Sequence, residues 1–165
     1  MATALTEFGT YNDYRAVLGV DSDELEDTTL ALELYSSFLE MELAEVSEDV
    51  PAEYVTVKAI AELSRTTEQA VFYAATRLFA LYAVANQLGT SLPLFSPKDI
   101  TDGKASISRY ADSPYRDTLK NVTKNYDRLK NKLAAAYSTL SSSSNTVPVR
   151  NYFAVSSPTY DPVVG

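Results

Sequence analysis

The most regular feature of this 165-residue chain is an apolar repeat between residues 115 and 140. Its members alternate steps of four and three residues: Tyr115, Leu119, Val122, Tyr126, Leu129, Leu133, Ala136 and Leu140. Ser113 and Pro114 stand just before the repeat and are typical N-cap and first-turn residues. This spacing predicts a long helix with a heptad seam. We favour packing of the seam against other helices of the chain over a free coiled coil.

The rest of residues 1–140 also predicts helices. Thr10 with Asp13, and then Gly19, mark the two ends of a first helix. A second, at about 28–46, has two adjacent apolar stripes and therefore needs more than one neighbour. Candidate caps at 64–69 divide the next apolar run into a third helix at about 52–64 and a fourth at about 67–88. We expect a mainly α protein, a four- to five-helix bundle, with excess apolar surface on the second and fourth helices.

Between the fourth and fifth helices, at about 89–113, the composition predicts a long structured loop. Pro97 and the Asp102-Gly103 pair are turn residues. Because binding residues favour loops held by a rigid scaffold, we predict subunit or partner contacts here. The candidate contact residues are Asp102, Gly103, Lys104, Arg109 and Tyr110, with Gly103 supplying the turn and Arg109 an ion pair to an acidic neighbour. On composition alone, a long surface connection is an equal alternative.

The chain divides into a helical domain at 1–140 and a terminal segment at 141–165. A serine-rich hinge precedes residues that are too apolar for a disordered tail. The apolar set of this extended C-terminal arm includes Val149, Tyr152, Phe153, Val155, Tyr160 and Val163. We predict that the arm docks on a neighbour by strand addition or by seating its aromatic rings in grooves. Folding back onto its own domain is the alternative.

Charge is distributed unevenly around a formal net value of −8. Residues 16–57 contain twelve acids and no Lys or Arg, whereas residues 98–132 contain nine bases and five acids. The fifth helix carries a basic stripe of Lys120, Lys124, Arg128 and Lys132. Two surfaces of opposite sign suit a head-to-tail contact between identical copies, although two solvated faces are the commoner arrangement. An acidic chain also argues against a general nucleic-acid binder.

The sequence lacks the residues that several kinds of catalytic and metal-binding site require. The chain has no Cys and no His, which removes thiol nucleophiles, disulfides, Ser-His triads and Cys/His zinc sites. The segment 102–106 is superficially similar to a phosphate loop, but Ala105 stands where Ser or Thr should follow the lysine. The paired carboxylates have no neighbouring base or aromatic pocket. We therefore expect no enzymatic activity, no cofactor and no metal site.

No membrane association is expected either. The N-terminus has neither the basic nor the apolar region of a signal peptide. The most apolar window, 70–88, contains Arg77, Asn86 and Gln87. This window predicts a buried or subunit-facing helix rather than a membrane span.

Together, several short motifs resemble the head-to-tail adaptor (connector, or head completion) proteins of tailed bacteriophages. They are FALY at 79–82, SPKDI at 96–100, DGKAS at 102–106, Arg109-Tyr110, SPY at 113–115 and, near the N-terminus, YNDYRAVLGVDSDEL at 11–25 with LEMEL at 39–43. The similarity covers roughly residues 11–140. The helices and the tail here are longer than in the smaller members of that family.

The resemblance implies a structural virion protein of the neck, between capsid and tail, that is assembled in the host cytoplasm. It implies a homo-oligomeric ring, usually twelvefold, that docks on the portal protein, extends the DNA channel and meets tail or nozzle proteins. The arm would engage the portal, and double-stranded DNA would pass without sequence-specific binding. We predict that Glu40, Glu42 and Glu45 point outward and, as a hypothesis, face the channel. The alternative is a non-enzymatic helical binding module, such as an assembly chaperone or a regulator.

Overall fold

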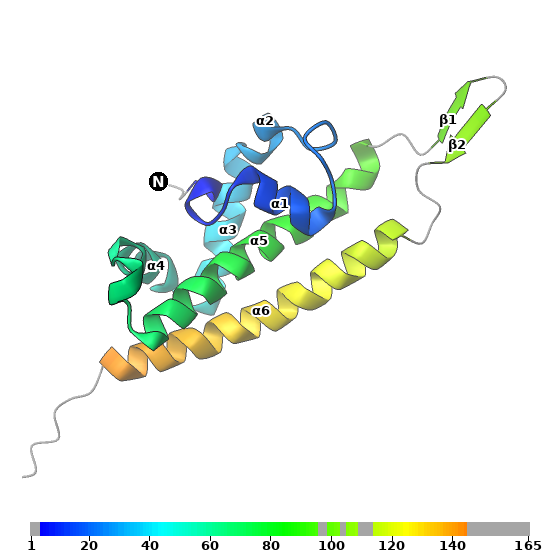
Figure 1. The fold of residues 1–165 in the computed structure, drawn as a ribbon. Helices are drawn as coiled ribbons and strands as arrows, with labels where there is room; N and C mark the ends of the chain where they lie inside the picture. Colours follow the sequence, from blue (N-terminus) through cyan, green and yellow to red (C-terminus); the bar gives the residue numbers. More distant parts are fainter. Residues whose placement is uncertain (1–3, 96–98, 103–104, 109–113, 145–165) are drawn as a thin grey trace, which may run out of the picture.

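The computed structural model describes residues 4–95, 99–102, 105–108 and 114–144 (Figure 1). This part of the chain forms six α-helices, two short 3-10 helices and one β-hairpin. In chain order the elements are η1 (Leu5–Glu7), α1 (Tyr11–Leu18), α2 (Asp27–Leu30), α3 (Glu33–Val46), α4 (Val50–Ala59), η2 (Glu62–Ser64), α5 (Thr67–Phe95), β1 (Asp99–Asp102), β2 (Ala105–Ser108) and α6 (Pro114–Ser144). The predicted mainly α class is confirmed.

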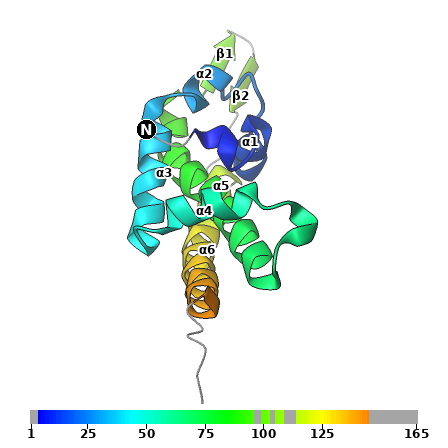
Figure 2. The same cartoon turned by 90° about the vertical axis from the view of Figure 1, so that its left-hand side faces the viewer.

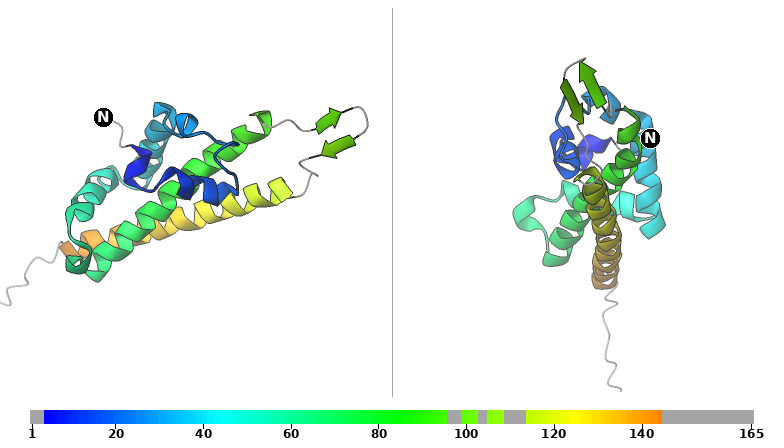
Figure 3. Two further views of the ribbon diagram at one scale, coloured as in Figure 1. Left: turned by 45° about the horizontal axis from the view of Figure 1, so that its top comes forward. Right: turned by 90° about the vertical axis from the view of Figure 1, so that its right-hand side faces the viewer.

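Helices α5 and α6 form a long antiparallel pair that runs the length of the molecule (Figures 1 and 3). Five members of the heptad seam are buried: Val122, Leu129, Leu133, Ala136 and Leu140. The ring of Tyr126 stacks on Phe79 with centroids 5.6 Å apart, and the ring of Tyr137 lies 6.0 Å from that of Phe72. The prediction that the seam packs within the chain is therefore confirmed.

The shorter helices α1, α3 and α4 pack around α5 and bury the aromatic part of the core. Tyr14, Phe8 and Phe72 are among its largest fully buried side chains. Phe8 stacks on Tyr54 at 4.6 Å, and Tyr54 stacks in turn on Tyr73 at 5.4 Å. This column of rings joins the N-terminal turn to α4 and α5.

The predicted ends of the first helix are confirmed in atomic detail. Thr10 and Asp13 form a reciprocal capping box, in which the Asp13 carboxylate accepts from the Thr10 amide at 2.7 Å and the Thr10 hydroxyl accepts from the Asp13 amide at 3.3 Å. Gly19 ends the helix with a φ of 71°, a conformation that glycine adopts without a steric penalty.

The second predicted helix is interrupted, which the apolar spacing does not indicate. Extended backbone at Leu32 separates α2 from α3. Leu30 and Tyr35 are both buried, yet residues five positions apart lie about 140° apart around a continuous helix. The break lets both side chains reach the core. The third predicted helix also ends early, at Ala59, where the Arg65 guanidinium donates to the carbonyls of Val57 and Lys58.

The prediction that a loop begins at Gly89 is wrong, because α5 continues to Phe95. A Cβ atom at Gly89 would lie 2.2 Å from Leu119 Cδ2. The Leu119 side chain would have to move to admit a side chain at this position, and Gly89 does not end the helix. Beyond α5, the described part of the loop is an antiparallel hairpin in which Ile100 pairs with Ile107 and Asp102 with Ala105.

Candidate interaction surfaces

The hairpin lies beyond one end of the α5–α6 pair, away from the bundle (Figures 1 and 3). Of the predicted contact residues, Asp102 is the last residue of β1, next to the connection between the strands. Gly103, Lys104, Arg109 and Tyr110 lie outside the described residues. The backbone thus places Asp102 at the projecting tip, and a contact there stays a prediction.

Helix α6 ends at Ser144, at the opposite end of the molecule from the hairpin (Figure 1). The predicted arm residues Val149, Tyr152, Phe153, Val155, Tyr160 and Val163 all lie outside the described part of the chain. Their docking stays a prediction. The structure shows only where the arm leaves the helical domain.

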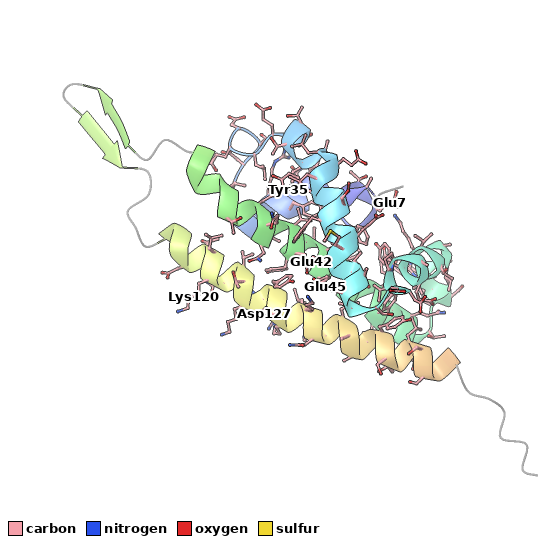
Figure 4. All side chains as sticks on the ribbon, turned by 180° about the vertical axis from the view of Figure 1, so that it is seen from behind. Glu7, Tyr35, Glu42, Glu45, Lys120 and Asp127 are labelled. Carbon is pink, nitrogen blue, oxygen red and sulfur yellow. The ribbon has the colours of Figure 1, made fainter. Side chains whose placement is uncertain are left out.

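The prediction that Glu40, Glu42 and Glu45 all point outward is wrong for Glu42. Its side chain is only 14% exposed, because it lies between α3 and α6 (Figure 4). The Tyr126 hydroxyl donates a hydrogen bond to its carboxylate, and Lys130 Nζ lies 3.6 Å from the same Oε2 atom. Apolar spacing alone could not reveal this site, since partners on α6 are needed to place the carboxylate.

Glu45 contacts the same lysine from a more open position. Lys130 Nζ lies 2.5 Å from Glu45 Oε2, and the Glu45 side chain is 60% exposed. The hydrogen bond to Glu45 raises the pKa of Lys130, and burial together with the Glu42 hydrogen bond raises the pKa of Tyr126. Glu40 is partly exposed. Glu42 and Glu45 therefore bind Lys130 of α6 instead of standing as free carboxylates.

The basic stripe of α6 is exposed, as its spacing predicts. Lys120, Lys124, Arg128 and Lys132 all lie on the solvent side of the helix, and Lys120 points away from α3 (Figure 4). Among the residues whose side chains are described, none of the four has an ion-pair partner. Four cations on one helix face are available to an acidic partner.

An acidic segment between α1 and α2 is fixed by a buried arginine that the charge pattern did not single out. Arg15 is 6% exposed and donates to the Leu25 carbonyl at 2.7 Å and to Asn12 Oδ1 at 2.9 Å. Its second terminal nitrogen pairs with Asp27. Arg15 stands directly before the acidic run, and this was the available signal. The contacts hold exposed acids such as Asp21 and Asp23 in a defined loop.

The expected excess of apolar surface is present on both predicted helices. On α3, Leu34 is 63% and Met41 68% exposed, and on α5, Val71 is 54% and Leu78 47% exposed. These exposed apolar side chains are candidates for an interaction surface.

Over the part of the chain with described side chains, no group of acidic residues is arranged to hold a metal ion. Within that same part, no helix combines the length and apolarity that a membrane crossing requires. Comparison of the chain with known protein families, curated proteins and solved structures finds no match.

Proposed function

We propose that this chain is a non-enzymatic structural protein of a tailed-phage virion, a ring-forming adaptor that joins the portal to the tail. The observation that carries the proposal is that the hairpin and the C-terminal end of α6 lie at opposite ends of the α5–α6 pair. The hairpin extends from one end of the α5–α6 pair, and the C-terminal arm starts at the other (Figure 1). The 31 residues of α6 alone span about 46 Å at 1.5 Å per residue. A rigid rod with a different segment at each end suits a protein that bridges two partners.

The surface of the bundle supports self-association. It carries an exposed basic stripe on α6, fixed acids between α1 and α2, and exposed apolar side chains on α3 and α5. Unlike surfaces of this kind favour a head-to-tail contact, which closes into a ring when the rotation between copies allows it. In a ring the hairpins would gather at one end and the arms at the other. We propose twelve copies, in the neck of the particle, with assembly in the host cytoplasm.

The proposed ring encloses a DNA channel, and Glu42 and Glu45 are poor candidates for its lining. Glu42 and Glu45 are paired with Lys130, which counts against their use as free carboxylates toward DNA. We propose that passing double-stranded DNA meets other acidic surface of the ring and is not bound sequence-specifically, because phosphate contacts are made by Lys and Arg.

Negative-stain microscopy of the purified chain mixed with a phage portal protein tests the adaptor function. The expected result is a ring seated on the portal, together with the presence of the chain in purified particles. A chain that stays monomeric or dimeric, binds no portal and is absent from particles would instead be a binding module such as an assembly chaperone.

Removal of residues 145–165 tests the role of the arm separately. We expect the truncated chain to keep its helical circular dichroism and melting temperature but to bind the portal more weakly. A large loss of thermal stability would show that the arm folds back onto its own domain.

A further inference from the structure

The basic stripe of α6 starts on the side of the helix that faces away from the core. Lys120 and Lys124 stand nine residues before two buried residues of the seam, Leu129 and Leu133. Nine residues make two and a half helical turns, so each lysine lies opposite its leucine. The first half of the stripe therefore points directly outward.

The second half of the stripe winds toward the flank of α6 that lies away from α3. Lys130 reaches α3, where it pairs with Glu45. Arg128 and Lys132 stand two residues before and after Lys130, so they project from the other flank. The four cations together cover about 18 Å of helix surface that α3 does not reach.

Repulsion within the stripe is not relieved by the acids of its own helix. Consecutive members are four residues apart and form three like-charged pairs, an arrangement that destabilises a helix. Asp117 and Asp127 are the acids of α6, and both are exposed. Among the described side chains, neither lies within ion-pair distance of the stripe. An acidic partner would relieve this repulsion.

The turn between α1 and α2 carries the opposite charge. We call residues 21–26 the acidic turn; its acids are Asp21, Asp23, Glu24 and Glu26. Asp21 Oδ1 accepts hydrogen bonds from the amides of Asp23 and Glu24 at 3.0 Å each, which fixes the path of the turn. Asp23 and Glu26 are exposed, and over the part of the chain that the structure describes they have no cation within ion-pair distance.

The acidic turn and the basic stripe lie on opposite sides of the molecule. Two perpendicular views place α2, into which the turn leads, on one side of α5 and α6 on the other (Figures 1 and 2). Since the stripe also points away from the core, it faces away from the acidic turn of its own copy. The two surfaces can therefore meet only between copies.

We propose that the basic stripe of one copy binds the acidic turn of a second copy. Charge complementarity selects this occupant. Glu42 and Glu45 are already paired with Lys130 in their own copy, whereas Asp23 and Glu26 have no such cation. Because the two surfaces differ and face opposite directions, the contact is heterologous and can repeat from copy to copy. The contact deepens the proposed adaptor function, and its closure into a ring rests on that function.

Zero-length cross-linking of the native chain tests the contact directly. Unlabelled and isotope-labelled chains are mixed, concentrated and treated with a carbodiimide, which joins a carboxylate to an amine that touches it. Products that combine the two isotopes come from different copies. We expect these products to join the acidic turn to a lysine of the basic stripe. They should be lost at about 1 M NaCl, where the Debye length is only about 3 Å.

Charge reversal supplies a second measurement. Lys124→Glu with Arg128→Glu, and Asp23→Lys with Glu26→Lys, should each weaken self-association at least about tenfold in sedimentation velocity. A mixture of the two double variants should recover it, because each reversed surface then meets a reversed partner. Asp21 is left unchanged, since its carboxylate holds the turn.

The matched control reverses two acids outside the turn. Glu48→Lys with Glu62→Lys makes the same change in net charge at exposed positions and should alter self-association less than about twofold. Circular dichroism confirms that each variant is folded.

Three results overturn the proposal. The first is a native chain that stays monomeric when concentrated at low salt. The second is a set of cross-links between copies that avoids the stripe, or a variant mixture that associates no better than either variant alone. The third is loss of binding to a DNA duplex on reversal of the stripe while self-association is unchanged, because the stripe would then serve nucleic acid.

These outcomes are separable from those of the adaptor function. A chain that gives the expected cross-links but binds no portal refutes the adaptor and leaves the contact standing. Rings on a portal that lack these cross-links refute the contact alone.

Discussion

The Tyr126 hydroxyl of α6 donates a hydrogen bond to the Glu42 carboxylate of α3. The two residues sit at the point where α3 meets the long helix pair. The Tyr126 ring stacks on Phe79 of α5 below the hydrogen bond, and Lys130 supplies a cation to the same carboxylate. One side chain of α6 thus contacts both of the other helices that define the bundle. This contact joins α3 to α6.

Tyr126→Phe removes the hydroxyl and keeps the ring. We expect the free energy of unfolding to fall by about 1 to 2 kcal/mol, because the partly buried Glu42 carboxylate loses a donor. Urea denaturation followed by circular dichroism measures the change. Tyr137→Phe is the matched control: its hydroxyl reaches Asp49 at 3.3 Å in an exposed position, so it should cost less than about 0.5 kcal/mol. Equal effects from the two variants would contradict the importance assigned to Glu42.

Charge reversal should affect Glu42 and Glu45 very differently. Glu42→Lys places a second ammonium group beside Lys130 in a site where the native side chain is 14% exposed, and we expect a loss of about 2 to 4 kcal/mol in unfolding free energy. Glu45→Lys changes a side chain that is 60% exposed, and its cost should stay below about 1 kcal/mol. Thermal denaturation of both variants is the measurement. If Glu42→Lys is as stable as Glu45→Lys, the α3–α6 contact does not hold the bundle.

The sequence predicts the helices of this fold well where the signal is local. The Thr10–Asp13 capping box, the start of α6 at Pro114 and the buried face of α6 all follow from short-range spacing and are confirmed. The errors arise where distant residues decide. Gly89 is a typical helix-ending residue by its type, yet α5 continues through it, and its closeness to Leu119 of α6 depends on the packing of two distant segments.

The sequence predicts which helices expose apolar residues, but it does not predict which way those residues face. Excess apolar residues on the second and fourth predicted helices indicated interfaces, and both helices do expose them. The side that the apolar residues of α3 face depends on how α3 packs against the other helices. Helical spacing places Glu42 on the outside, whereas in the structure it contacts α6. Helical spacing does not identify Arg15 for a similar reason, because its partners Leu25 and Asp27 are placed by a turn whose path the spacing does not predict.

The capping box of α1 gives the protein an acid-sensitive contribution to stability. Hydrogen bonds from the Thr10 amide and hydroxyl lower the pKa of Asp13 below its ordinary value of 3.8. A carboxyl group whose pKa is lower in the folded state stabilises the fold above its unfolded pKa and loses this effect as the pH falls through the folded one. The contribution should therefore be complete well above pH 3.8, the ordinary value, and be lost as the pH falls below 3.8 and through the lower pKa of the folded state.

Asp13→Asn measures this contribution. The difference in unfolding free energy between the native chain and the variant should be constant near neutral pH and shrink as the pH is lowered toward about 2. Thr10→Ala, which removes the cap itself, should cost about 1 kcal/mol at neutral pH. A difference that grows on acidification would show that the charged form of Asp13 is not the one stabilised by Thr10.

Gly89 tests how closely α5 and α6 must approach. At an open helical position, Gly→Ala stabilises a helix by about 0.5 to 1 kcal/mol. Here the added Cβ would lie 2.2 Å from Leu119 Cδ2, so Leu119 must move. Overpacking of this kind costs about 1 to 3 kcal/mol, and we expect Gly89→Ala to lower the free energy of unfolding.

A double variant separates the steric effect of the added Cβ from the higher intrinsic helix propensity of alanine. Leu119→Ala removes the atom that Cβ would meet, so in that background Gly89→Ala should be neutral or stabilising. Urea denaturation of the native chain, the two single variants and the double variant gives the coupling free energy between the two substitutions. This coupling should be favourable by at least about 1 kcal/mol. If Gly89→Ala instead stabilises the native chain, the helices have room at this level. In that case α5 continues past Gly89 for a reason other than close packing against α6.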